Sequence, residues 1–107
     1  MKYRVQITAS AEADIADIID YIAEYDSPES AEYVLDKLEE LCLDLEITPN
    51  RGNIPAELAR IFVRNFRQIH FKPYRIIYSV QGSTVYVHCV LDGRRDLQDL
   101  LGRRLLR

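Results

Sequence analysis

The clearest structural signal in this chain is the run Pro73-Tyr74-Arg75-Ile76-Ile77-Tyr78-Ser79-Val80. Its β-branched and aromatic residues are those that strands favour. A second such run, Thr84 to Leu91, follows the turn signal Gln81-Gly82-Ser83, and a third, Phe66 to Phe71, lies before it. Strand-like runs separated by a short glycine-containing turn are typical of hairpins. The sequence therefore predicts three consecutive antiparallel strands.

The residues before these strands predict a further strand and a helix. Residues 2–7 alternate between polar and apolar side chains, as a half-buried strand does. An amphipathic helix follows, with Thr8 or Ser10 as its N-cap and an end near Tyr25. Its apolar stripe has the spacing i, i+3, i+4, i+7 and consists of Ile15, Ile18, Ile19 and Ile22.

A second helix begins at Ser27-Pro28, where serine can cap and proline suits the first helical position. Its apolar stripe runs from Ala31 to Leu45, and so short a link predicts an antiparallel helical hairpin. Pro55 to Ile61 can hold a helical turn, and Leu97 to Leu106 a short final helix. We therefore predict a single α+β domain, residues 1–107, in the order β-α-α-β-β-β-α. The helical hairpin should pack on a small antiparallel sheet.

Composition excludes several classes of protein. The chain has 107 residues, of which 48% are hydrophobic and 29% charged, a mixture that fits one globular domain. Cys42 and Cys89 lie far apart within apolar patterns, so we expect buried thiols rather than a metal or redox motif. We expect no metal and no cofactor. No apolar run is long enough for a signal peptide or a membrane span, so we expect a cytoplasmic protein.

Charge is divided unevenly along the chain. Residues 1–50 hold three basic and 13 acidic residues, a net charge of −10, whereas residues 51–107 hold 11 basic and four acidic residues, a net charge of +7. Such asymmetry suggests two faces with different partners. Mutual attraction of the two halves is the simpler alternative.

Arg75 is the most informative polar residue, because it interrupts an otherwise apolar strand. Alternation predicts that Tyr74, Ile76, Tyr78 and Val80 face the helices, while Arg75, Ile77 and Ser79 face the other side. We expect Arg67, on the preceding strand, to be its neighbour. An open sheet face lined by arginines suits phosphate, which guanidinium binds with two hydrogen bonds. An exposed arginine, or one paired with Asp92 or Asp96, explains the same pattern.

Other basic residues predict a charged edge. Arg94 and Arg95 directly follow the last strand, and Arg103, Arg104 and Arg107 gather near the C-terminus. These residues can bind an acidic partner or merely solubilise the tail. His70 is a candidate general acid or base, because histidine is the side-chain type most often used to transfer protons. The chain contains no glycine-rich phosphate loop and no serine-hydrolase motif, which excludes a conventional kinase, dehydrogenase or hydrolase.

Three segments in this order resemble the RelE/ParE superfamily of bacterial type II toxin–antitoxin toxins. They are residues 10–15, residues 73–78 and the sequence Val90-Leu91-Asp92-Gly93-Arg94-Arg95-Asp96-Leu97. The resemblance covers nearly the whole chain and implies the same α+β fold. It also implies neutralisation by an antitoxin whose C-terminal segment wraps across the toxin as a helix beside the hairpin and a strand added to the sheet. The oligomeric state, a homodimer or a hetero-oligomer with the antitoxin, stays open.

The ParE branch of this superfamily poisons DNA gyrase and has no nuclease residues. Leu101 stands where several nucleases have a tyrosine, and this favours the ParE branch. In that case the protein arrests growth without being an enzyme. Arg94, Arg95, Arg103 and Arg104 are then the residues that contact the target, and Arg75 organises the sheet face. Two departures from the family pattern are Asp92, in place of a histidine, and the net charge of −3.

Two alternatives remain. RelE-like members cut mRNA on the ribosome, and Arg75 and Arg95 match their arginine positions. In such an endoribonuclease Arg67 would assist and His70 would carry a proton, while the RNA 2′-OH would supply the nucleophile. The third reading is a non-toxic binding module that acts with its antitoxin as a co-repressor.

Overall fold

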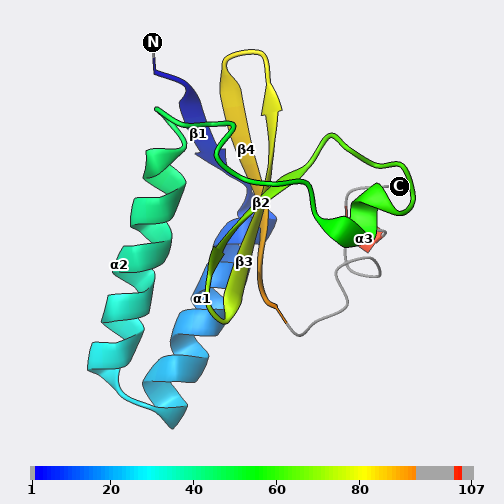
Figure 1. Ribbon diagram of the computed structural model, residues 1–107. Helices are drawn as coiled ribbons and strands as arrows, with labels where there is room; N and C mark the ends of the chain where they lie inside the picture. The colour runs from blue at the N-terminus through cyan, green and yellow to red at the C-terminus, as the bar shows by residue number, and fades with distance from the viewer. Residues whose placement is uncertain (1, 94–102, 105–107) are drawn as a thin grey trace.

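The computed structural model describes residues 2–93 and 103–104 of the chain (Figure 1). Its elements follow the predicted order as far as the last strand. They are β1 (Arg4–Ile7), α1 (Ala9–Tyr25), α2 (Pro28–Asp44), α3 (Ala56–Ala59), β2 (Arg67–Phe71), β3 (Tyr74–Gln81) and β4 (Thr84–Asp92). The predicted final helix, residues 97–106, lies outside the described residues except for Arg103 and Arg104, which are helical.

The capping residues explain where the two long helices begin. Thr8 precedes α1, and its hydroxyl accepts a hydrogen bond from the backbone N–H of Ala11 at 3.2 Å. Ser27 does the same for α2, accepting from the backbone N–H of Ser30 at 3.0 Å, and Pro28 occupies the first turn. The two helices are thus set apart by a link of two residues, and they pack side by side as a hairpin.

The strand order is β1-β4-β3-β2. β2 pairs with β3 and β3 with β4 in antiparallel register, as predicted. β1 pairs with β4 in parallel, so the sheet is mixed rather than purely antiparallel. The helical hairpin and α3 lead from β1 at one edge of the sheet to β2 at the other edge, and the β2-β3-β4 meander returns to β1. The register shifts between Ile77 and Tyr78, where β4 carries one extra residue, His88.

Both faces of the sheet are covered, and this corrects one expectation. The main core lies between the helical hairpin and one face, and it includes Leu38, Ile76 and Tyr78. A smaller core covers the opposite face, where Leu58 of α3 packs with Phe66, Ile77, Cys89 and Leu91. Figure 1 places α3 and the hairpin on opposite sides of the sheet. The face that carries Arg75 is therefore not the open surface that the sequence suggested.

The two cysteines are buried and free, as predicted. Burial raises the pKa of each thiol to about 11, so both stay protonated at neutral pH. Within residues 2–93 and 103–104, no three histidine, cysteine or acidic side chains come together to hold a metal ion. In the same part of the chain, no helix combines the length and the apolar character needed to cross a membrane.

Candidate functional site

A pocket of about 400 Å³ opens beside the end of the β2–β3 hairpin, on the face that α3 partly covers. The predicted residues Arg75 and His70 both line it. The other polar side chains in its wall are Asn53, Glu57, Gln68 and Lys72. The pocket therefore brings together two of the predicted site residues, Arg75 and His70.

Arg75 is buried and held by neighbours within the chain. Its two terminal nitrogens donate to the two carboxylate oxygens of Glu57, at 2.8 and 3.1 Å. Its Nε donates to the side-chain oxygen of Gln68 at 2.9 Å. Only 9% of the side chain is exposed, compared with 30% for Glu57. The guanidinium of Arg75, which we predicted to bind a phosphate, is thus bound to the carboxylate of Glu57.

Glu57 is the ion-pair partner that sequence reasoning missed. It lies on the single turn of α3, 18 residues before Arg75. The hydrogen bonds from Arg75 lower the pKa of Glu57 despite its partial burial, and the charge of Arg60 lowers it further. The pair is consequently ionised at neutral pH. The negative charge of Glu57 therefore offsets the positive charge of Arg75 in the wall of the pocket.

His70 and Arg67 lie on opposite faces of β2. His70 is exposed and sits directly across from Arg75 in the β2–β3 register. Arg67 shares the face of Ile69 and Phe71, which pack against the helical hairpin, and its guanidinium donates to the carbonyl of Gly52 at 2.6 Å. The prediction that Arg67 neighbours Arg75 is wrong, because strand alternation separates them. Gln68 takes that place.

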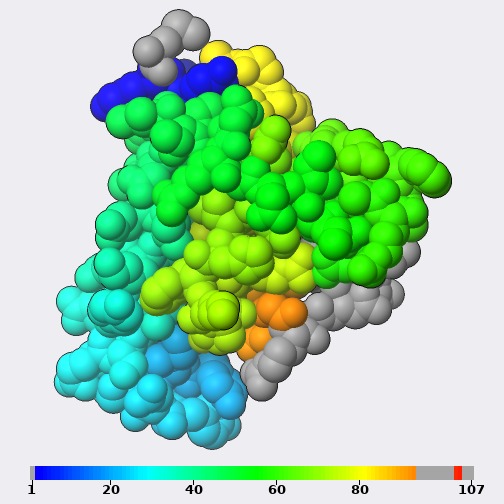
Figure 2. Space-filling model, in the orientation of Figure 1, coloured from blue at the N-terminus to red at the C-terminus, as the bar shows by residue number. Residues whose placement is uncertain are grey.

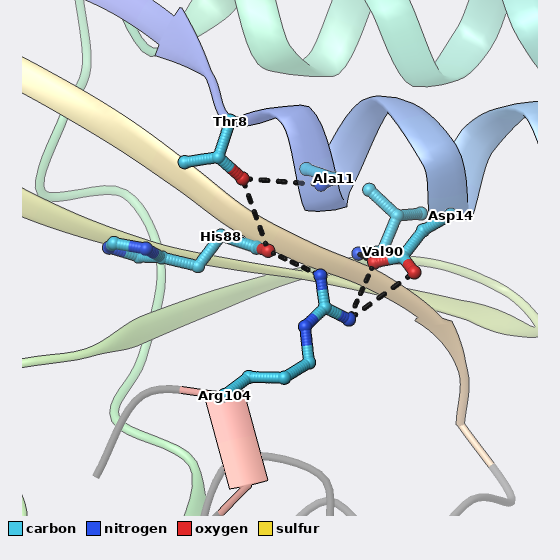
Figure 3. Close-up of polar contacts among 6 residues, drawn as sticks. All are labelled: Thr8, Ala11, Asp14, His88, Val90 and Arg104. Carbon is cyan, nitrogen blue, oxygen red and sulfur yellow. Dashed lines mark hydrogen bonds and ion pairs between the residues drawn. The ribbon is translucent and has the colours of Figure 1, made fainter. Parts of the chain in front are cut away.

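Arg104 binds residues 103–104 to the body of the protein. Its guanidinium donates to Asp14 of α1 at 3.0 Å and to the backbone carbonyl of His88 at 3.1 Å (Figure 3). Asp14 also accepts from the backbone N–H of Val90 at 3.0 Å. β1 pairs with β4 only as far as Val87, so Asp14 and Arg104 together satisfy the edge of β4 where no strand lies.

The remaining predicted contact residues divide between described and undescribed parts of the chain. Arg94 and Arg95 lie outside the described residues. Arg103 is helical and exposed. Arg104 has about 20% of its side chain exposed, so most of its guanidinium is used internally.

His88 is a second feature that the sequence did not single out. Its Nε2 lies 2.7 Å from the hydroxyl of the buried Ser79, and its ring meets the edge of Phe66. Burial, and secondarily the charge of Arg104, lowers the pKa of His88, so the ring is neutral at pH 7. The β-bulge that sets His88 apart from its neighbours cannot be recognised from the sequence.

The described pocket has little of what phosphoryl chemistry requires. Its arginine is paired with Glu57, and its histidine, His70, is exposed. Positioned donors that stabilise a developing charge are usually the largest catalytic contribution. Within the described residues, the guanidinium of Arg75 is thus held by a carboxylate and an amide of the same chain.

Solved structures show the same architecture. The chain is similar to a chromosomal ParDE toxin–antitoxin system from P. aeruginosa, with a TM-score of 0.71 and 19% identity over 85% of this chain and 96% of that one. It is also similar to the RelBE2 toxin–antitoxin complex from Mycobacterium tuberculosis, with a TM-score of 0.63 and 19% identity over 86% and 92%. At this identity the likeness establishes the fold alone.

Sequence comparison establishes the family. No curated protein is significantly similar to the chain. The family model described as the ParE toxin of type II toxin–antitoxin systems, parDE, matches residues 5–97, which is most of the chain. The chain therefore belongs to the ParE toxin family, within the RelE/ParE superfamily of type II toxin–antitoxin systems.

Proposed function

We propose that this ParE-family toxin poisons DNA gyrase by binding it and stabilising its cleaved DNA complex, and that it is not itself an enzyme. The single observation that carries this proposal is the pairing of Arg75 with Glu57 and Gln68. A ribosome-dependent nuclease needs this arginine position free to hold the scissile phosphate. Here the guanidinium would first have to give up a two-point ion pair in a largely buried setting.

The mRNA endonuclease remains the second candidate, because His70 and Lys72 line the same pocket as Arg75. Release of Arg75 from Glu57 would put three groups with nitrogen donors around one cavity. In that mechanism Arg75 and Arg95 hold the phosphate and His70 moves the proton. The two mechanisms differ in one requirement: only the nuclease depends on a free Arg75.

Arg94, Arg95 and Arg103 are the proposed contacts with the target. They follow β4, and they belong to the half of the chain that carries the positive charge. Arg104 has a different part in this account. Its bonds to Asp14 and to the carbonyl of His88 hold Arg104 against the sheet, so it positions Arg103 rather than contacting gyrase itself.

A cognate antitoxin is the proposed neutralising partner, and the helical hairpin is the surface that suits it. α1 and α2 carry most of the acidic residues of the chain. Among these acids stand exposed aromatic rings, with Tyr21 64%, Tyr25 69% and Tyr33 57% exposed. Lysine and arginine side chains can pair with the carboxylates and pack over the rings. A basic, partly apolar antitoxin segment fits this surface.

The proposal is tested with purified, antitoxin-free protein, gyrase and a supercoiled plasmid. We expect linear DNA to appear after denaturation of the complexes, and addition of the antitoxin to abolish it. Absence of linear DNA and normal supercoiling at a large excess of toxin would contradict the proposal. If expression of the chain alone also fails to arrest host growth, the non-toxic binding module becomes the better account.

A further inference from the structure

Phe62 is the most exposed large apolar residue among those described, with 87% of its surface accessible. It lies just after α3, in a segment that projects from the body of the molecule on the right of Figure 2. Its neighbour Ile61 is 38% exposed, whereas Val63 packs against the smaller core. We call residues 60–64 the apolar tip. Val63 anchors the tip to the smaller core, and Phe62 presents its aromatic ring to solvent.

The backbone holds Phe62 in a conformation that normally calls for glycine. Its φ is 63°, and it is the only described residue other than glycine with a positive φ. The N–H of Val63 donates to the carbonyl of Leu58 at 2.9 Å, and that of Phe62 to Ala59 at 3.1 Å. This pair of bonds is the Schellman pattern, whose left-handed residue is usually glycine because a side chain there is strained. The β3–β4 turn does use a glycine, Gly82, at φ 62°.

An aromatic residue with a positive φ and 87% of its surface exposed adds little to the stability of the fold. Glycine at position 62 would relieve the backbone strain, and a polar side chain would be better hydrated than phenylalanine. Strained backbone conformations gather at functional sites, where the surrounding structure maintains them. The hydrogen bonds of the turn and the buried Val63 supply that support here.

The charges beside Phe62 indicate what kind of surface it meets. Arg60 and Arg64 are both exposed, two residues before and two residues after it. No aspartate or glutamate occurs from residue 58 to residue 91. The nearest carboxylate in sequence, Glu57, is paired with Arg75. The tip therefore combines an apolar centre with positive flanks, which is complementary to an apolar pocket rimmed by carboxylates.

A protein pocket fits these observations better than a nucleic acid. The whole chain carries a net charge of −3, and its acidic half would be repelled by a phosphate backbone. Three consecutive apolar residues, 61–63, occupy the centre of the tip. Aromatic and arginine side chains are the types that contribute most at protein–protein interfaces. The acidic hairpin lies on the opposite side of the sheet, so a basic partner segment bound there leaves the tip free.

We propose that Phe62 is an anchor that inserts into an apolar, carboxylate-rimmed pocket on the target protein, with Arg60 and Arg64 pairing with the rim. The target is DNA gyrase, and in this respect the inference rests on the function proposed above. The hydrogen-bonded turn fixes the backbone that carries the ring before contact is made, which lowers the entropy lost on binding. The strain at Phe62 is thus retained for recognition.

The test measures binding of the antitoxin-free chain to immobilised gyrase holoenzyme. Phe62→Gly and Phe62→Ser should bind about 30-fold more weakly, as expected when an interface anchor is truncated. Ile47→Ser is the matched control, because Ile47 is also highly exposed, at 71%, but lies in the loop after α2. It should bind within about twofold of the wild type. Phe62→Gly should also melt at a higher temperature than the wild type, since glycine tolerates the left-handed backbone.

Four outcomes would overturn the inference. Unchanged gyrase binding by both Phe62 variants, with the wild type bound, removes the anchor while leaving the proposed function intact. Failure of the wild type to bind gyrase removes both. Binding of a short DNA duplex that depends on Phe62 assigns the tip to nucleic acid. Self-association of the wild type that Phe62→Ser abolishes, seen by sedimentation, assigns it to a second copy of the chain.

Discussion

Arg75 and Glu57 form a two-point ion pair across the sheet face opposite the helical hairpin, with nitrogen–oxygen distances of 2.8 and 3.1 Å. The pair joins the single turn of α3 to the central strand β3. It fixes the loop between α2 and β2 over the sheet, and it withdraws the one arginine of β3 from other partners. The ion pair thus links α3 to the sheet through the guanidinium of Arg75.

Glu57→Gln should destabilise the fold by about 1–2 kcal/mol, because the buried guanidinium of Arg75 loses its carboxylate partner. The loss is moderate because position 57 is partly exposed to water. Urea unfolding measures the loss. Glu39→Gln, an exposed site on α2, should change the free energy of unfolding by less than about 0.5 kcal/mol. Equal effects of the two substitutions would mean that the ion pair contributes nothing measurable.

Acid should weaken the same contact. The pKa of Glu57 is lower in the folded protein than its usual value near 4.5, so the folded state binds its proton less readily than the unfolded state does. The stabilisation is fully present above pH 4.5 and is lost as the pH falls through the lower folded value. Unfolding measured from pH 6 to pH 3 should therefore show a steeper loss for the wild type than for Glu57→Gln. Parallel curves would contradict this.

His88 should titrate below its ordinary range. Burial is the larger cause of its lowered pKa, and the charge of Arg104 is the smaller one. NMR titration, with His70→Gln used to assign the two imidazole signals, should place the pKa of His88 below 6.5. Arg104→Met should raise that value without restoring it fully, because burial remains. No change in Arg104→Met would show that the guanidinium is not near the ring in solution.

Asp14 and Arg104 should stabilise the fold cooperatively. A double-mutant cycle with Asp14→Ala and Arg104→Ala should give a coupling energy of about 1 kcal/mol, since both side chains are roughly four-fifths buried. The pair Lys2 and Glu46, with nitrogen and oxygen 3.9 Å apart and side chains 75% and 30% exposed, provides the control cycle. Its coupling should be close to zero. A zero value for Asp14 and Arg104 would mean that the C-terminal segment does not bind α1 and β4.

Gly52 should not tolerate a side chain. A Cβ atom there would overlap the backbone oxygen of Gln68 and lie 2.8 Å from the hydroxyl of Tyr78, which accepts from the N–H of Gly52. Gly52→Ala should cost about 2 kcal/mol or more, measured by urea unfolding. Gly82→Ala meets no atom within 4 Å and should cost about 1 kcal/mol, from its positive φ alone. The reverse order would show that the 48–53 loop is not packed on Tyr78.

The sequence predicted the elements as far as β4, and the face to which the side chains of β3 point, because both depend on local periodicity. Tyr74, Ile76, Tyr78 and Val80 pack against the hairpin as their alternation required. The same rule, applied from Ile69 and Phe71, would have put Arg67 on the hairpin face. The parallel pairing of β1 with β4 depends on a long connection, and local pattern cannot fix that.

The contacts that define the candidate site were beyond sequence reasoning for physical reasons. Glu57 lies on one turn of helix in a loop, and its partner is 18 residues away. Phe62 adopts a conformation that sequence would assign to glycine, so nothing in the sequence marks it. In the sequence, nothing distinguishes Asp14 from the other acidic residues of α1. Its bonds to Val90 and Arg104 arise only when the two ends of the chain meet.

The most direct test of the account compares both targets with one protein preparation. Purified, antitoxin-free chain is added to gyrase with plasmid DNA in one reaction, and to translating ribosomes with mapped mRNA ends in another. We predict trapped, cleaved DNA and intact mRNA. New mRNA ends within codons, lost on Arg75→Met, with gyrase unaffected, would contradict the account and make Arg75 a catalytic residue.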